Sequence, residues 1–153
     1  MEEPPLYSRR AVIVFVDDLD PSTMAALRYA RSLRPTVMRA VHLVIDGEQA
    51  ERLRAAWLPG RGELLQFVDC SGQRLTRCAA DLVRREAEKP GAQVTVILPG
   101  RSFPPRLGRR LHGRRADKIA AVVSRVPNVA VAIIPPSRAA FQGVETRPVG
   151  RTP

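Results

Sequence analysis

Short aliphatic segments alternate along this chain with longer segments of helical periodicity, and this alternation limits the fold more than any other feature. Residues 11–16 form a continuous apolar run rich in valine, which is typical of a strand buried on both faces. Four further strands are predicted at residues 37–45, 64–68, 94–98 and 129–134. Helices are predicted between them at residues 21–33, 48–57, 75–88 and 116–125. The pattern predicts an α/β fold, a doubly wound five-stranded parallel sheet of flavodoxin-like size.

The chain of 153 residues fits one domain with a sizeable core. We expect the domain to occupy residues 9–136, after an N-terminal extension at 1–8. Residues 137–153 are polar and rich in proline and glycine, so we expect a flexible C-terminal tail. No apolar run approaches the ~20 residues that span a bilayer, and no signal region is present. We therefore expect a cytoplasmic protein, with a position at the inner face of the membrane as the alternative.

Two cysteines, Cys70 and Cys78, are too few for a disulfide framework and have no partners at metal-binding spacing. We expect both to be ordinary thiols of a reducing compartment.

The formal net charge of +10 favours anionic partners. Only Lys89 and Lys118 are lysines, so almost every cation is an arginine, whose planar guanidinium group matches phosphate. A coding bias toward arginine would explain part of the total charge, but not where the arginines cluster.

The arginines cluster most densely in a long segment, residues 99–115, between the fourth strand and the last predicted helix. It contains Arg101, Arg106, Arg109, Arg110, Arg114 and Arg115, together with Gly100, Gly108 and Gly113. Glycines let a backbone approach a phosphate closely, and the N-terminus of the following helix offers free N–H groups. The segment therefore predicts an anion site, with a solvated basic surface loop as the alternative.

Ligands of open parallel sheets bind beyond the carboxyl ends of the strands. Asp17, Asp18 and Leu19 follow the first strand, and Val44 lies near the end of the second. We expect these residues to line the ligand site with the arginine-rich segment. Asp20 is expected to cap the next helix, which begins at Pro21.

The order of elements and the loop before the last helix resemble the universal stress protein family, over about residues 9–136. ATP-binding members carry Gly-x2-Gly-x9-Gly-(Ser/Thr) after the fourth strand. Gly100 and Gly113 match the outer glycines, whereas Phe103 and Arg114 replace the middle glycine and the Ser/Thr. Asp17 matches the acidic residue near the adenosine. The resemblance implies an adenine nucleotide alpha hydrolase-like sheet of order 3-2-1-4-5.

A closer resemblance is to the cytosolic C-terminal domains of bacterial APC-superfamily permeases, including KimA-like potassium importers. The similar stretches are residues 27–34, 68–70, 74–77, 101–102, 107–112 and 116–127. In the KimA-like group such domains form homodimers and bind cyclic di-AMP, which inhibits transport. The resemblance implies a nucleotide-binding regulatory domain for signal transduction, associated with or derived from a membrane transporter of potassium or amino acids.

We expect no enzymatic role, no catalytic residue, no metal and no cofactor; weak ATPase activity stays open. Contacts to phosphate are expected from Arg101, Ser102, Arg106, Arg114 and Arg115, and contacts to base or ribose from Asp17, Leu19 and Val44. The remaining expected ligand-binding residues are Asp18, Gly100, Phe103, Gly108, His112 and Gly113. The alternatives are a stand-alone ATP-binding universal stress protein and a basic nucleic-acid-binding module. The chain lacks the exposed aromatics or recognition helix that nucleic-acid binding favours.

Overall fold

The computed structural model describes residues 7–57, 64–100 and 110–135, and for residues 110–114 it describes the backbone only. The elements in chain order are β1 (Arg9–Phe15), α1 (Pro21–Ser32), β2 (Val37–Val44), α2 (Gly47–Ala56), β3 (Leu65–Asp69), α3 (Leu75–Ala87), β4 (Ala92–Pro99), α4 (Arg110–Val123) and β5 (Val129–Ile134). Each predicted strand and helix is present, with ends that differ by a few residues except at α4. The predicted tail at residues 137–153 lies outside the described residues.

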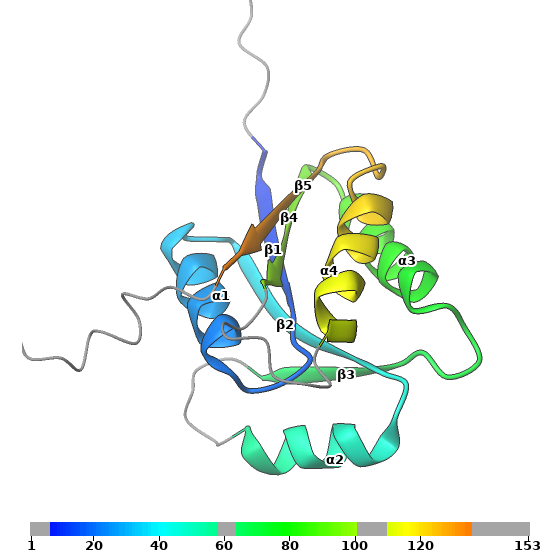
Figure 1. The fold of residues 1–153 in the computed structure, drawn as a ribbon. Coiled ribbons are helices and arrows are strands. Elements are labelled where there is room, and N and C mark those ends of the chain that lie inside the picture. The colour runs from blue at the N-terminus through cyan, green and yellow to red at the C-terminus, as the bar shows by residue number, and fades with distance from the viewer. Residues whose placement is uncertain (1–6, 58–63, 101–109, 136–153) are drawn as a thin grey trace, which may run out of the picture.

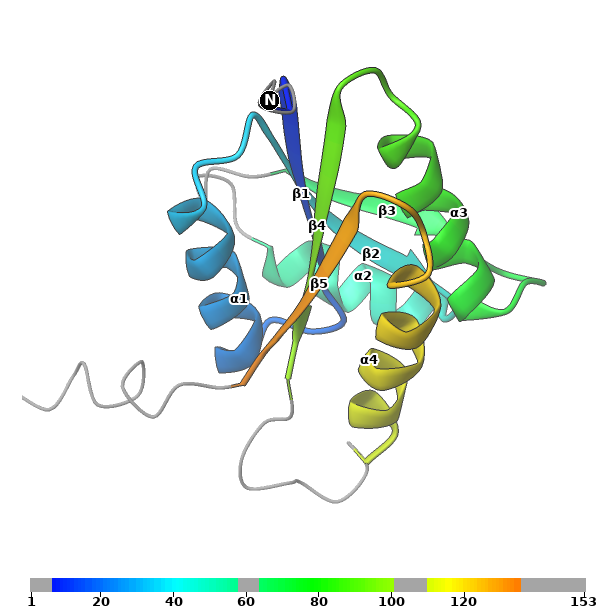
Figure 2. The same cartoon turned by 90° about the horizontal axis from the view of Figure 1, so that it is seen from above.

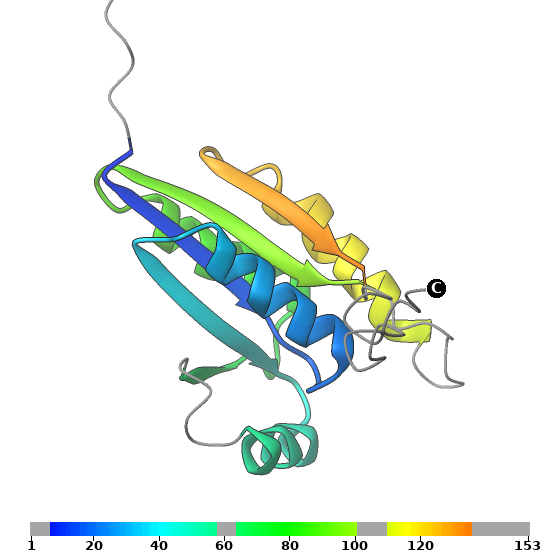
Figure 3. The same cartoon turned by 90° about the vertical axis from the view of Figure 1, so that its left-hand side faces the viewer.

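All five strands are parallel and lie in the order β3-β2-β1-β4-β5. The helices α3 and α4 cover one face of the sheet and α1 lies along the other (Figures 1 and 2). The view in Figure 3 has α1 in front of the strands and α3 and α4 behind them. The predicted α/β fold, doubly wound with strand order 3-2-1-4-5, is confirmed.

The core is divided by the sheet into two clusters of buried side chains. Alternate residues of β1 belong to different clusters because successive side chains of a strand point to opposite faces. Ala11, Ile13 and Phe15 pack toward α3 and α4, whereas Val12 and Val14 pack toward α1. The central strand is therefore buried on both faces, which explains its unbroken apolar run.

The helix α1 begins as predicted. The Asp20 carboxylate accepts a hydrogen bond from the Thr23 backbone N–H at 2.9 Å, and Pro21 occupies the first turn. The helix ends before Arg34, which has a φ of 48° and so turns the chain toward β2.

The helix α4 begins at Arg110, earlier than the predicted start at Ala116. His112, Gly113, Arg114 and Arg115 therefore lie in the helix and not in a loop, and that part of the prediction is wrong. Gly113 suggested a loop, but one glycine inside a helix costs only about 1 kcal/mol. The packing of α4 against α3 and the sheet, in which Ile119 and Val123 are buried, outweighs that cost.

The prediction that Cys70 and Cys78 are free thiols is also wrong, because the two form a disulfide with a Cα–Cα distance of 5.9 Å. Cys70 follows β3 directly and Cys78 lies on the buried face of α3. Gly72, with a φ of 78°, lets the chain reverse between them. Both sulfur atoms consequently enter the same core cluster.

Within the described residues, no helix combines the length and apolar character needed to cross a membrane.

Candidate functional site

The strand order places a topological switch point at β1 and β4. From β1 the chain winds through β2 to β3 on one side, then crosses to β4 and β5 on the other. Neighbouring connections leave the sheet in opposite directions at this point, and ligands of open α/β sheets bind outside the carboxyl ends of the strands at such a point. Asp17, Asp18 and Leu19 follow β1 and Gly100 follows β4, so the fold brings these predicted site residues to adjoining strand ends.

The loop after β1, residues 17–20, is held by hydrogen bonds from several elements. Gln49 of α2 donates from Nε2 to the Asp17 carbonyl oxygen at 3.1 Å. The Thr23 hydroxyl donates to the Asp18 carbonyl oxygen at 2.7 Å, and the Leu19 N–H donates to the Asp18 carboxylate at 2.8 Å. These hydrogen bonds hold the loop without a ligand, so a ligand bound there would contact a preorganised surface.

Two further contacts tie β2 to this edge. The Val44 carbonyl oxygen accepts a hydrogen bond from the Cys70 N–H at 2.9 Å. The turn closed by the disulfide is therefore bonded to Val44, which is a predicted site residue. Buried His42 has its Nδ1 2.7 Å from the Val16 carbonyl oxygen, just before the loop. Its Nε2 has no hydrogen-bond partner among the described residues. His42 lies inside β2, and its contact with the Val16 carbonyl oxygen gives it a structural role at the end of β1.

Gly100 is required by packing. Its N–H donates to the Ile134 carbonyl oxygen at 2.7 Å. A Cβ on this residue would lie 2.9 Å from that same oxygen and 2.9 Å from the Pro135 Cα. Close approach of β4 to the end of β5 therefore explains the glycine without a ligand.

The other predicted residues come from the segment between β4 and α4 and from α4 itself. Arg101, Ser102, Phe103, Arg106 and Gly108 lie outside the described residues. His112, Gly113 and Arg114 lie in the first turns of α4, whose backbone alone is described there, and Arg115 is partly buried on the same helix. The arginine-rich segment thus leads into a helix N-terminus, where backbone N–H groups lack intrahelical partners.

Within the described parts of the chain, no group of three or more His, Cys, Asp or Glu side chains could hold a metal ion. The carboxylates of Asp18, Asp20 and Asp46 each accept a backbone N–H instead. Asp69, at the end of β3, accepts the Ser71 N–H at 2.8 Å, and the hydrogen bonds from Ser71 lower the pKa of this carboxyl.

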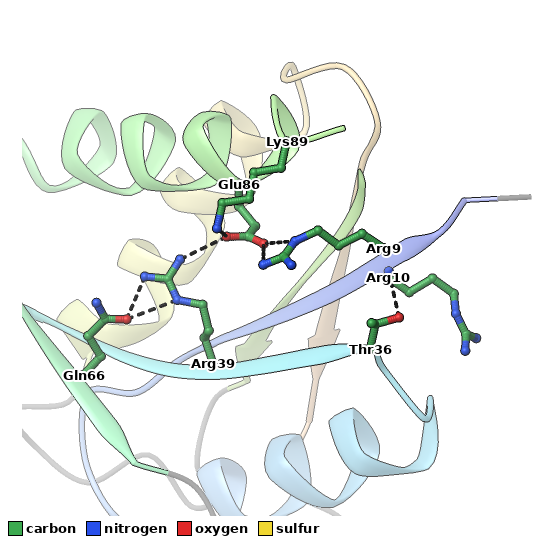
Figure 4. Close-up of polar contacts among 7 residues, drawn as sticks. All are labelled: Arg9, Arg10, Thr36, Arg39, Gln66, Glu86 and Lys89. Atoms are coloured by element: carbon green, nitrogen blue, oxygen red, sulfur yellow. Dashed lines mark hydrogen bonds and ion pairs between the residues drawn. The ribbon is translucent and has the colours of Figure 1, made fainter. Parts of the chain in front are cut away.

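A cluster of charges that the sequence did not predict lies where β1 begins and α3 ends (Figure 4). The side chain of Glu86 is fully buried, and its Oε1 lies 2.8 Å from Nη2 of Arg9. Its Oε2 lies 2.9 Å from Nζ of Lys89 and 3.3 Å from Nη1 of Arg39. Arg39 also donates to the Gln66 side-chain oxygen at 2.6 Å. The Glu86 cluster, these five residues, joins α3 to three strands.

The pKa of Glu86 reflects two opposing effects. Burial raises it, while the hydrogen bonds and positive charges of Lys89 and Arg9 lower it more, so the pKa lies below its usual value. A signal for this residue was present in the sequence: Glu86 lies three residues after Val83, on the inner face of α3. A carboxylate in such a position requires cationic or hydrogen-bonding partners.

Residues 8–136 match the family described as the KimA potassium transporter C-terminal domain. No curated protein matches the sequence.

Proposed function

We propose, from the premise that this chain belongs to the family of KimA potassium transporter C-terminal domains, that it is a non-enzymatic domain that binds cyclic di-AMP. Family membership points to a regulatory domain linked to potassium transport. The nucleotide, its site and the absence of catalysis are parts of the proposal.

The observation that carries the proposal is the convergence of two features at the switch point. A loop fixed by its own hydrogen bonds follows β1, and the arginine-rich segment leaves β4 at Gly100 and leads into α4. Guanidinium groups and free helix N–H groups suit phosphates. Asp17, Leu19 and Val44 would then flank a base or ribose, and Arg101, Arg106 and Arg114 would contact phosphate.

The choice of a cyclic dinucleotide over ATP depends on the departures from the universal stress protein pattern. Phe103 and Arg114 stand where ATP-binding members have a glycine and a Ser/Thr. Gly100 has a packing role and Gly113 lies within α4, so neither glycine by itself supports a triphosphate loop. Two phosphates and two adenines suit additional arginine and aromatic side chains.

We further propose that the domain forms a homodimer through β5. This edge strand pairs with β4 alone in the described structure, and its six residues are all apolar. Ile133 is 43% exposed. An exposed apolar edge strand readily pairs with another strand, and a second copy would cover it. Light scattering on a size-exclusion column should give twice the monomer mass, and Ala132→Lys should shift the protein to monomer. A monomeric wild-type protein would contradict the dimer.

The nucleotide proposal is tested by calorimetric titration of the protein with cyclic di-AMP, ATP and AMP in parallel. We expect cyclic di-AMP to bind most tightly and the double variant Arg101→Ala/Arg114→Ala to lose that binding with little change in melting temperature. Arg52→Ala/Arg54→Ala on α2 removes the same charge and is the control. Tight ATP binding with no response to cyclic di-AMP would instead favour the ATP-binding alternative. A large loss of stability in the first variant would show that the two arginines are structural.

A further inference from the structure

The connections at the two ends of β1, β2 and β3 differ in charge among the described residues, whereas the arginine-rich segment follows the carboxyl end of β4. The connections at the carboxyl ends of β1, β2 and β3 are mostly acidic, with Asp17, Asp18, Asp20, Asp46, Glu48 and Asp69. At the opposite end, where strands begin and helices end, basic side chains predominate. They are Arg9, Arg10, Arg31, Arg34, Arg85, Lys89 and Arg125, and we call this set the basic edge. In Figure 1 this is the upper end, where β1 begins and α1, α3 and α4 end.

Among the described residues, the acidic ones at this end are Glu86 and Glu88, and they offset little of the basic charge. Glu86 is buried and bonded by Arg9, Arg39 and Lys89, so one negative charge is shared among three cations and faces no solvent. That arrangement also holds Arg9 and Lys89 at the surface, with side chains 30% and 48% exposed. The Glu86 cluster therefore keeps a net positive charge.

Arg10 and Arg34 extend the basic edge beside the Glu86 cluster. The Arg10 backbone N–H donates to the Thr36 hydroxyl at 3.2 Å (Figure 4). Its guanidinium donates to the Arg34 carbonyl oxygen at 3.1 Å. Both side chains are exposed. Basic residues at helix C-termini complement the helix dipole, which accounts for Arg31 and Arg85. The dipole does not account for Arg9 and Arg10, which begin a strand.

We propose that the basic edge docks onto the anionic headgroups of the membrane that holds the transporter. Two observations support this occupant. The first is charge complementarity: exposed Arg and Lys side chains near an anionic membrane surface attract it additively. The second is orientation: β1 begins at this edge, and a domain that is C-terminal in a transporter is joined to the rest of that transporter through the start of its first strand. Half-exposed Tyr7 beside β1 has the amphipathic character typical of the membrane interface.

This inference uses the family assignment but not the nucleotide site. Docking at the basic edge would leave the carboxyl ends of β1 and β4, at the opposite end of the sheet, facing away from the lipid. A ligand could then reach the site while the domain is docked.

The experiment is co-sedimentation of the protein with phosphatidylcholine vesicles, with and without about a third phosphatidylglycerol. The test variant Arg10→Glu/Arg34→Glu is compared with Arg74→Glu/Arg77→Glu, which makes the same charge change on exposed residues at the carboxyl end of the sheet. We expect binding to the anionic vesicles only, weakened by 0.5 M salt. The test variant should lower the partition coefficient by about twenty-five-fold or more, on the basis of about five-fold per basic residue, and the control by much less.

A second test pair, Arg85→Glu/Arg125→Glu, takes no part in the Arg10 hydrogen bonds. It should lower the partition coefficient by the same factor, so the proposal can still be tested if the first pair disturbs folding. Equal losses in the test and control variants would overturn the proposal, as would binding to neutral vesicles or no binding at all. The proposal would also be overturned if only the variant Arg101→Glu/Arg106→Glu lost vesicle binding, because that result would assign lipid contact to the carboxyl end of the sheet. Titration of Arg10→Glu/Arg34→Glu with cyclic di-AMP separates the two proposals, because nucleotide binding should be retained.

Discussion

Replacement of Glu86 by glutamine tests how the domain is held together at the start of the sheet. Glutamine keeps the shape of the side chain but removes its charge and points an N–H₂ group at cations. The wild-type carboxylate is fully buried, with Arg9, Lys89 and Arg39 at 2.8, 2.9 and 3.3 Å. Breaking a buried ion pair costs about 3–5 kcal/mol when the remaining charge stays buried.

In Glu86→Gln the remaining cations are 26–48% exposed and can turn toward water, which reduces the cost. We therefore expect a loss of about 2–3 kcal/mol in the free energy of unfolding, below the range for fully buried pairs. The melting temperature should fall by about 5–10 °C for a domain of this size. Asp81→Asn on the same helix is the control. Its pair with Arg84, at 3.2 Å, has side chains 41% and 54% exposed, so its loss should stay below about 0.5 kcal/mol.

The assay is urea unfolding of both variants and the wild type between pH 3 and pH 7. The pKa of Glu86 is lower in the folded protein than its usual 4.5. Its stabilising effect is therefore fully present above that value and is lost as the pH falls through the folded pKa. The difference between wild type and Glu86→Gln should be constant near neutrality and shrink in acid. A glutamine variant as stable as wild type, or a difference that does not shrink, would refute this account of the Glu86 cluster.

Three other substitutions or treatments follow from the structure. Gly100→Ala should lower the unfolding free energy by about 1–3 kcal/mol in urea titration, because the new Cβ meets Ile134 and Pro135; an unchanged midpoint would contradict the packing role. Reduction of the Cys70–Cys78 disulfide, which closes a loop of sequence separation 8, should cost about 2–3 kcal/mol. Melting with and without a phosphine reductant measures it, and the Cys70→Ser/Cys78→Ser variant should be insensitive to the reductant. Asp20→Ala should cost about 1 kcal/mol by loss of the cap on α1, whereas Asp20→Ser should restore most of it.

The sequence predicted the sheet well because the burial of a strand determines the pattern of apolar residues within that strand. The apolar run in β1 has no alternation since both of its faces are covered, and Asp20 followed by Pro21 is a local signal for a helix start. These features depend on neighbours in the chain, so one sequence is enough to read them.

The features that the sequence missed depend on pairs of residues that meet only in the fold. Cys78 lies on the inner stripe of α3 and Cys70 follows β3, so their sulfur atoms meet only when α3 packs on the sheet. Glu86 occupies the same stripe, but its partners Arg9 and Arg39 lie on other elements. At α4 the local signal misled, because Gly113 suggested a loop where tertiary packing maintains a helix.

The positions of some candidate site residues follow from the fold, while their contacts to a ligand stay predictions. The fold brings the loop after β1 and Gly100 to adjoining strand ends, as expected from the position of ligands in parallel sheets. The structure then gives Gly100 a packing role that the sequence alone did not indicate. The roles of Arg101, Ser102, Phe103, Arg106 and Gly108 stay predictions.

The most direct measurement is a crystal structure of the protein with cyclic di-AMP. The account predicts ligand density beyond the carboxyl ends of β1 and β4, with a base beside Asp17 and Leu19 and a phosphate within hydrogen-bonding distance of Arg101 or Arg114. Crystals grown at saturating nucleotide that show no density there, or density at another part of the surface, would contradict it.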